Sequence, residues 1–272
     1  MHASHRLTLL ARLGFAARGV VYILVGWFAL EAARTGGQPV DNQAALASLV
    51  DEPLGRALLL VIALGLLGYA MWRLLEAALD PEQRSKSTKG KLERAGSAIS
   101  GITHLMLAVY AVRLAMHDTV AGGAAPGDSS AQGWSAWLMA QPGGTLLLIL
   151  VGVVLFIVAA AQATKSWKAT FMRDLDGGAP VPGYVRIAGR IGYGARALVF
   201  ALIGWFFIRA ALHANPDEAG GMGQALRELQ GQHYGPVLLG LVAVGLFLFG
   251  LFSLVEARFR RLKVVAPTSG IG

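Results

Sequence analysis

Residues 11–30 read ARLGFAARGVVYILVGWFAL, residues 93–112 read ERAGSAISGITHLMLAVYAV, and residues 189–208 read GRIGYGARALVFALIGWFFI. The three stretches follow one pattern. Each opens with an Arg-x-Gly and continues as an apolar run of about the length that enters a bilayer. Similarity that recurs along a chain is the signature of a repeated structural unit. The sequence therefore predicts three copies of one membrane-embedded unit.

The composition agrees with a membrane location. The 272 residues are 55% hydrophobic and 15% charged, and their mean hydropathy is +0.54. A soluble domain of this length needs a more polar surface. Continuous apolar runs without two-residue alternation predict helices, because lipid offers the backbone no hydrogen-bond partner. The sequence predicts an all-α membrane protein with six transmembrane helices, at about residues 15–33, 56–75, 98–115, 144–163, 194–212 and 236–255.

The basic residues predict the orientation. Of the 24 Lys and Arg residues, 19 lie at the two termini, at residues 73–97 or at residues 162–196, and only 5 lie in the alternate loops. Cytoplasmic segments carry this excess, so both termini of this multi-pass membrane protein are expected in the cytoplasm. The basic hinge at residues 84–91 and the tail at 258–263 are interpreted as topology determinants. They would attract anionic membrane lipids, and nucleic acid is not expected as a partner.

The repeat includes a second helix in each unit. A shift of 180 residues superposes Gly55 on Gly235 and Glu76 on Glu256, with Gly144 at the corresponding place in the middle unit. We expect one membrane domain over residues 1–272, with repeats at about 8–80, 90–168 and 186–262 in a pseudo-threefold arrangement. Before each second helix, the short segments AALASLV (44–50), SAWLMA (135–140) and QALRELQ (224–230) have apolar residues at helical spacing. They are expected to be interfacial helices.

Two positions change their charge together from one unit to the next. They carry Arg18 and Glu76 in the first unit, Ser100 and Gln162 in the second, and Arg196 and Glu256 in the third. Because an isolated charge near hydrocarbon is costly, the simplest hypothesis pairs the Arg and Glu of the same unit, with a neutral hydrogen bond in the middle unit. Snorkelling of each charge to water is the plain alternative. A proton or cation carrier is the functional alternative for either glutamate.

Few residues suggest chemistry. His104 is the one histidine expected inside a membrane helix, at the position that Tyr22 and Phe200 occupy in the other units. This alignment favours a packed, hydrogen-bonded ring over proton handling. The sequence contains no cysteine, no histidine spacing typical of a metal site and no known catalytic motif. We therefore expect no catalytic residue, cofactor or metal.

The opening at residues 12–22, its echo at residues 190–200 and the two-helix triplication resemble the bacterial membrane family called Domain of Unknown Function 1206. The first and third units carry the resemblance most closely, whereas Ser100 and His104 depart from it in the middle unit. The resemblance implies a six-helix bacterial inner-membrane protein and assigns no catalytic or binding residue. Mitochondrial carriers share only the three-unit architecture, and their Pro-x-Asp/Glu-x-x-Lys/Arg signature is missing from the odd helices.

These observations favour a structural or partner-binding role. The helices carry few polar residues that could line a pathway, and large external domains are not expected. Partners would be lipids, anionic on the cytoplasmic face, or other membrane proteins. A transporter or channel for a small solute, an ion or a lipid is the competing class, and a membrane-embedded enzyme is the third.

Overall fold

A computed structural model describes residues 2–79, 88–116, 126–175 and 182–260. Six long helices in these ranges contain the candidate membrane spans, which confirms the all-α, six-helix prediction. The helices continue past the predicted apolar segments, because helix formation does not stop where the hydrocarbon ends. They are α1 (His2–Thr35), α3 (Gly55–Leu79), α4 (Thr88–Met116), α6 (Gly144–Lys168), α7 (Gly183–Leu212) and α9 (Gly235–Phe259).

Short helices lie between the long ones. The segments α2 (Asn42–Ala47), α5 (Pro126–Met139) and α8 (Met222–Gln230) gather at one end of the bundle, which we call the cap end. The predicted short amphipathic segments are thus largely helical. Leu46 and Leu226 are completely buried, whereas Trp134 and Trp137 of α5 are 58% and 57% exposed. The 3₁₀ helix η3 (Pro216–Glu218) also lies at the cap end, and η2 (Thr170–Asp174) lies at the opposite end, here called the basic end.

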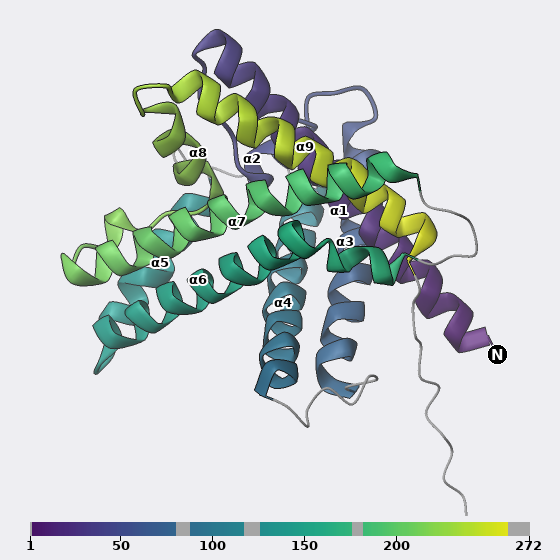
Figure 1. Cartoon of the computed structure of the whole chain (residues 1–272), viewed down its shortest axis with the longest axis horizontal. Coiled ribbons are helices and arrows are strands. Elements are labelled where there is room, and N and C mark those ends of the chain that lie inside the picture. The colour runs from purple at the N-terminus through teal and green to yellow at the C-terminus, as the bar shows by residue number, and fades with distance from the viewer. Residues whose placement is uncertain (1, 80–87, 117–125, 176–181, 261–272) are drawn as a thin grey trace, which may run out of the picture.

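The long helices form a row in which each packs on the next. Its order is α4, α3, α1, α9, α7 and α6. Figure 1 shows the three closest pairs, α3 with α4, α1 with α9 and α6 with α7, running side by side. Each of these pairs joins the first helix of one unit to the second helix of another. The three units therefore interlock, and α1 and α9 bring the first and last units together.

Glycines allow the pairs to approach closely. Helices α1 and α9 meet at Gly19 and Gly250, and α6 and α7 meet at Gly152 and Gly204. A Cβ added to any of the four would lie 2.7–2.9 Å from the backbone oxygen of its counterpart. Close backbone contact through small residues is a common way to pack helices where the hydrophobic effect does not drive association. These glycines are therefore required by packing.

The row of helices is open at one place. Contact between its two end members, α4 and α6, would close it into a ring, but within the described residues these helices scarcely touch. Buried residues make up only 28% and 22% of the apolar windows of α4 and α6, against 56% for α1. In Figure 1 the basic ends of α4 and α6 point in different directions. We call the space between these two helices the lateral gap.

The glycines of the Arg-x-Gly motif show that the lateral gap lies at the basic end. A Cβ on Gly14 would lie 2.5 Å from the Tyr69 Cβ on α3, and a Cβ on Gly192 would lie 2.7 Å from the Phe249 Cα on α9. A Cβ on the equivalent Gly96 of α4 would meet no described atom within 4 Å. The first and third units are thus tightly packed against their own second helices, whereas the middle unit is separated from its own.

Candidate functional site

The Arg18 side chain lies in the interior with only 7% of its surface exposed. Its Nη1 donates to the Tyr69 hydroxyl at 2.7 Å, its Nη2 donates to Ser253 Oγ at 3.1 Å, and Nη2 also binds the Glu256 carboxylate. The guanidinium carbon lies 4.9–5.1 Å from the ring centres of Phe15, Tyr69 and Phe249. A buried cation needs both partners and hydrogen bonds, and Arg18 has them.

The Glu256 carboxylate binds two cationic side chains. One carboxylate oxygen binds Arg18 of α1, and the other binds Arg260, which follows α9. Arg260 also pairs with Asp174 of η2 at 3.4 Å. Only 1% of the Glu256 side chain is exposed, so both ion pairs are largely shielded from water. We call Arg18, Tyr69, Ser253, Glu256 and Arg260 the Arg18 cluster. It joins α1 and α3 of the first unit to α9 of the third.

The hypothesis that charges pair within a unit is wrong. Arg18 binds Glu256 of the third unit, whereas Glu76 pairs with Arg73 at 2.6 Å and accepts a hydrogen bond from Ser97. The reason is the packing order, because α1 lies closer to α9 of the third unit than to α3 of its own. Arg18 also does not snorkel to water.

Arg196 occupies the equivalent position on α7, but its surroundings differ. Its guanidinium carbon lies 4.3 Å from the ring centre of Phe249, 5.3 Å from that of Tyr22 and 5.4 Å from that of Phe200. Within the described residues Arg196 has no carboxylate partner, and its buried Nε has no hydrogen-bond partner. Arg18 thus takes the carboxylate that the sequence hypothesis had assigned to Arg196.

The neutral positions of the middle unit are separate from one another. Gln162 on α6 is 7% exposed, and no described hydrogen bond joins it to Ser100 on α4. The Ser100 carbonyl instead lies 2.8 Å from Nδ1 of His104, one turn along the same helix. The predicted neutral bond within the unit is not formed, because α4 and α6 lie on opposite sides of the lateral gap.

His104 packs as an aromatic ring. Its centre lies 4.6 Å from that of Tyr69, whose hydroxyl belongs to the Arg18 cluster. The residue is half-buried and faces the same interior as Arg18. This placement agrees with the expected packed and hydrogen-bonded ring. It also puts the middle unit in contact with the cluster through α3.

The arginine of the Arg-x-Gly motif caps a neighbouring helix. Arg94 donates from Nε to the Ala77 carbonyl at 2.8 Å and from Nη2 to the Ala78 carbonyl at 3.3 Å, near the end of α3. Arg190 donates to the Ser166 carbonyl at 3.0 Å, near the end of α6. The last carbonyls of a helix lack intrahelical donors and favour a nearby cation. In the third unit the motif thus combines a cap for α6 with a glycine contact to α9.

Carboxylates link the short helices at the cap end. Asp41 accepts from the backbone N–H groups of Gln43 and Ala44 and from that of Gly127 in α5, at 2.8–2.9 Å. Burial raises the pKa of Asp41, although these backbone donors act to lower it. The first short helix is thereby tied to the second.

Asp128 makes the next link, from α5 to α8. It accepts from the N–H groups of Gly221 and Gln224 and pairs with Arg227 at 2.6 Å. Gly221 is the N-cap of α8 and has no side chain with which to cap it, so Asp128 of another unit does this instead. The middle unit is thus open at the basic end and firmly connected at the cap end.

The profile of Domain of Unknown Function (DUF1206) matches residues 13–80, 95–169 and 191–260, which are the three units. The chain belongs to the DUF1206 family. It is 35% identical over 254 residues to a protein of Bacillus subtilis (strain 168) described as uncharacterized protein YxxB, covering 92% of this chain and 90% of the relative. No solved structure matches this DUF1206 chain.

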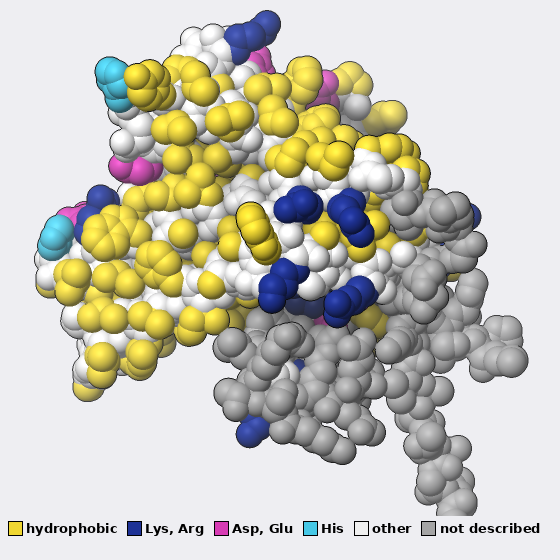
Figure 2. Space-filling view, in the orientation of Figure 1, with side chains coloured by type: hydrophobic (Ala, Val, Ile, Leu, Met, Phe, Trp, Pro, Cys, Tyr) yellow, Lys and Arg dark blue, Asp and Glu magenta, His cyan; other side chains and the backbone are white. Residues whose placement is uncertain are grey.

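Dark-blue side chains gather at the basic end of the DUF1206 chain, over α6 and α7 in Figure 2. Exposed basic residues there are Lys165, Lys168, Arg173, Arg186 and Arg190. Trp167 and Tyr184 lie among them in the sequence and are 79% and 71% exposed. Such a mixture suits the interface between hydrocarbon and headgroups. Residues 84–87 and 261–263 of the predicted basic hinge and tail lie outside the described ranges.

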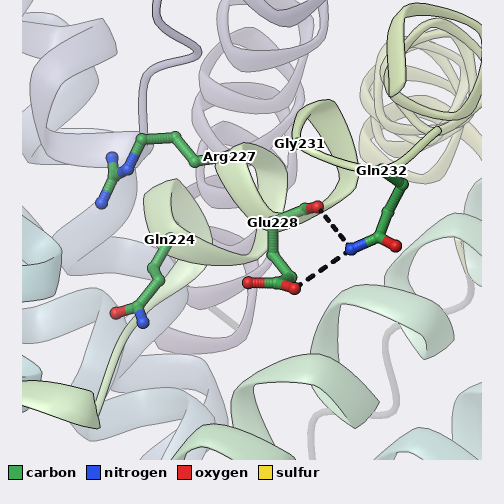
Figure 3. Close-up of a pocket in the computed structure, with 5 residues that line it drawn as sticks. All are labelled: Gln224, Arg227, Glu228, Gly231 and Gln232. Atoms are coloured by element: carbon green, nitrogen blue, oxygen red, sulfur yellow. Dashed lines mark hydrogen bonds between the residues drawn. The ribbon is translucent and has the colours of Figure 1, made fainter. Parts of the chain in front are cut away.

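A shallow depression at the cap end is shown in Figure 3. Gln224, Arg227, Glu228, Gly231 and Gln232 line it, and Gln232 Nε2 donates to the backbone oxygen of Glu228 at 3.2 Å and to its Oε1 at 3.1 Å. Its donors and acceptors are partly bonded to one another, and Arg227 is engaged by Asp128. This arrangement identifies no ligand.

Sequence reasoning missed several residues of the site. Tyr69, Ser253 and Arg260 complete the environment of Arg18 and Glu256, and Asp41 and Asp128 connect the short helices. Ser253 and Arg260 stand one turn before and one turn after Glu256, so helical spacing is a signal that could have found them. Tyr69 carries no such signal, because it comes from a different helix.

Proposed function

We propose that this DUF1206 protein has a structural or partner-binding role in the bacterial inner membrane, with both termini in the cytoplasm. The observation that supports this role is the Arg18 cluster, in which the charged groups bind one another and fasten the first unit to the last. Aromatic rings of Phe15, Tyr69 and Phe249 surround the guanidinium. A cluster whose charges bind one another inside a tightly packed shell of rings suits a rigid body better than a pathway.

We propose further that the protein is not an enzyme. Its partners are other membrane proteins and membrane lipids, and the basic end attracts anionic lipids in the cytoplasmic leaflet. A transporter or channel is the alternative, and the lateral gap favours it, because α4 and α6 leave the row of helices open on one side within the described residues. Flux measurements separate the two classes.

The test measures proton and monovalent-cation flux into proteoliposomes that contain the purified protein. We expect flux no faster than in protein-free vesicles, and an ionophore added at the end shows that the vesicles were sealed. We also expect purification in a mild detergent to retain a membrane-protein partner at fixed stoichiometry. Flux above the protein-free level that Glu76→Gln or Glu256→Gln abolishes would replace the structural proposal with transport.

A further inference from the structure

Arg196 is a half-buried cation whose Nε has no hydrogen-bond acceptor within the described residues. The aromatic rings around it contribute cation–π attraction, but they accept no strong hydrogen bonds from the guanidinium. Within the described residues no carboxylate binds it, and its Nε is buried without an acceptor. Arg18, at the same position in the first unit, has a carboxylate, two hydroxyl groups and rings. The comparison identifies an anion as the missing partner of Arg196.

A second cation stands beside Arg196. The Lys165 ammonium of α6 lies 5.6 Å from the ring centre of Tyr193, which is buried on α7. Tyr193 stands one turn before Arg196 on α7, and both side chains contact the ring of Phe249, at 5.3 Å from the Tyr193 ring centre and 4.3 Å from the Arg196 guanidinium carbon. Glu256 is already bound by Arg18 and Arg260. The half-buried Arg196 and the exposed Lys165 therefore form a positive region that no described carboxylate neutralises, and this region favours an external anion.

The lateral gap borders α6, the helix that carries Lys165. Helices α4 and α6 scarcely touch within the described residues, and Gly96 faces open space where its equivalents Gly14 and Gly192 face a helix. Apolar side chains on both helices, among them Ile102, Met106 and Val154, are 38–51% exposed. A ligand that enters here meets hydrocarbon on both sides and cations at its inner end. Only an amphiphile matches both surfaces.

The depth of the two cations matches a headgroup. Helix α7 ends at Leu212, sixteen residues after Arg196, or roughly 24 Å at the rise of an α-helix. Because the hydrocarbon core is about 30 Å thick, Arg196 lies near its boundary at the basic end. Lys165 is three residues from the end of α6 and lies closer to that surface. A lipid phosphate would reach both with its acyl chains still in the bilayer.

We propose that Arg196 and Lys165 bind the phosphate of an anionic membrane lipid, whose acyl chain occupies the lateral gap between α4 and α6. The guanidinium supplies directed, charge-assisted hydrogen bonds to the phosphate oxygens, and the ammonium supplies a second positive charge. The lipid would also cover the helix faces that α4 and α6 do not bury against each other. The site is distinct from the diffuse attraction of lipids to the basic end, and it is compatible with either a structural or a transport role.

The test counts lipids bound to the delipidated full-length protein in mild detergent by native mass spectrometry. Phosphatidylglycerol and phosphatidylcholine with the same acyl chains are titrated separately. We expect one phosphatidylglycerol to bind tightly and phosphatidylcholine to bind weakly. Arg196→Gln and Lys165→Gln should each weaken the phosphatidylglycerol site by about tenfold or more. Arg196→Lys should retain part of the affinity, because the charge remains but the directed hydrogen bonds of the guanidinium are lost.

Arg186→Gln is the matched control, since this arginine is exposed at the basic end of the same helix. It should leave the tight site unchanged. Gly96→Phe tests whether the acyl chain occupies the lateral gap, and it removes no charge. The phenyl ring would fill part of the gap, so lipid binding should weaken. Each variant is melted without lipid to establish that it is folded. If Arg196→Gln does not fold, Lys165→Gln and Gly96→Phe carry the test.

Three results would overturn the proposal. The first is equal binding of phosphatidylcholine, which would show that no anion is recognised. The second is an equal loss in Arg186→Gln and in the Arg196 or Lys165 variants, which would reduce the effect to diffuse surface charge. The third is displacement of the bound lipid by millimolar inorganic phosphate or glycerol phosphate, which would identify a site for a free anion.

Discussion

At the scale of the residue, the charges inside this protein are matched selectively. Glu256 binds Arg18 and Arg260 at once, whereas Arg196 is left among aromatic rings. A carboxylate placed between two cations makes both dependent on it, because within the described residues neither has a second carboxylate partner buried to the same degree. Arg260 retains only Asp174, whose side chain is 51% exposed. Glu256 is therefore the residue on which the interior electrostatics depend.

Glu256→Gln should destabilise the protein by about 3–5 kcal/mol, because it leaves Arg18 as an unpaired buried charge. The loss is measured by thermal unfolding in mild detergent. Glu228→Gln is the control at an exposed site, where a change within about 0.5 kcal/mol is expected. A Glu256→Gln variant that melts like the wild type would show that the buried pairs contribute nothing net to stability.

At the scale of the element, one motif serves two different purposes in different units. Gly14 and Gly192 bring helices of the same unit together, whereas Gly96 faces the lateral gap. The caps of the short helices also differ between units. Asp41 caps α2 of its own unit, whereas Asp128 caps α8 of another unit. Repetition of a sequence position therefore does not imply repetition of its contact.

Alanine at the three motif glycines should distinguish packed positions from the open one. Gly14→Ala and Gly192→Ala should each cost about 1–3 kcal/mol, because the added Cβ overlaps a neighbouring helix. Gly96→Ala should be neutral, or stabilising by up to about 1 kcal/mol through its higher helix propensity. Melting temperatures in detergent provide the comparison. Equal losses at all three glycines would mean that α4 and α6 are packed together.

The cap at Asp128 predicts a graded response. Asp128→Asn keeps an oxygen for the α8 backbone and loses the ion pair with Arg227, whereas Asp128→Ala loses both. Alanine should cost about 1–2 kcal/mol, the usual value of a lost N-cap, and asparagine less. Arg227→Gln is the matched variant for the ion pair alone. Identical unfolding of Asp128→Asn and Asp128→Ala would assign the whole effect to the ion pair.

At the scale of the whole molecule, the three units interlock because the first helix of each packs closely on the second helix of another unit. Helices α1 and α9 join the first unit to the last in this way. The middle unit connects at the cap end through α5 and separates at the basic end. The molecule is thus asymmetric in spite of its repeats. Its most open side faces the membrane between α4 and α6.

The absence of cysteine from the sequence permits a direct test of topology. We expect a membrane-impermeant maleimide to label Glu52→Cys at the cap end in intact cells, and to label Lys168→Cys only after the inner membrane is opened. Both positions are exposed, and the unsubstituted chain is the control for background labelling. The reverse pattern would place the basic end outside the cytoplasm, contrary to the distribution of Lys and Arg.

The sequence by itself determined the class of protein, the six helices and the three units, because hydrophobic length and internal similarity are local properties of a chain. It also singled out the positions of Arg18, Glu76, Arg196 and Glu256 as charges that need an explanation. Only the tertiary structure decided which charges meet. Arg18 and Glu256 are 238 residues apart, and they pair because a helix of the first unit packs most closely on a helix of the third. A repeat defines where a residue lies within its unit, but the packing between units defines its neighbour.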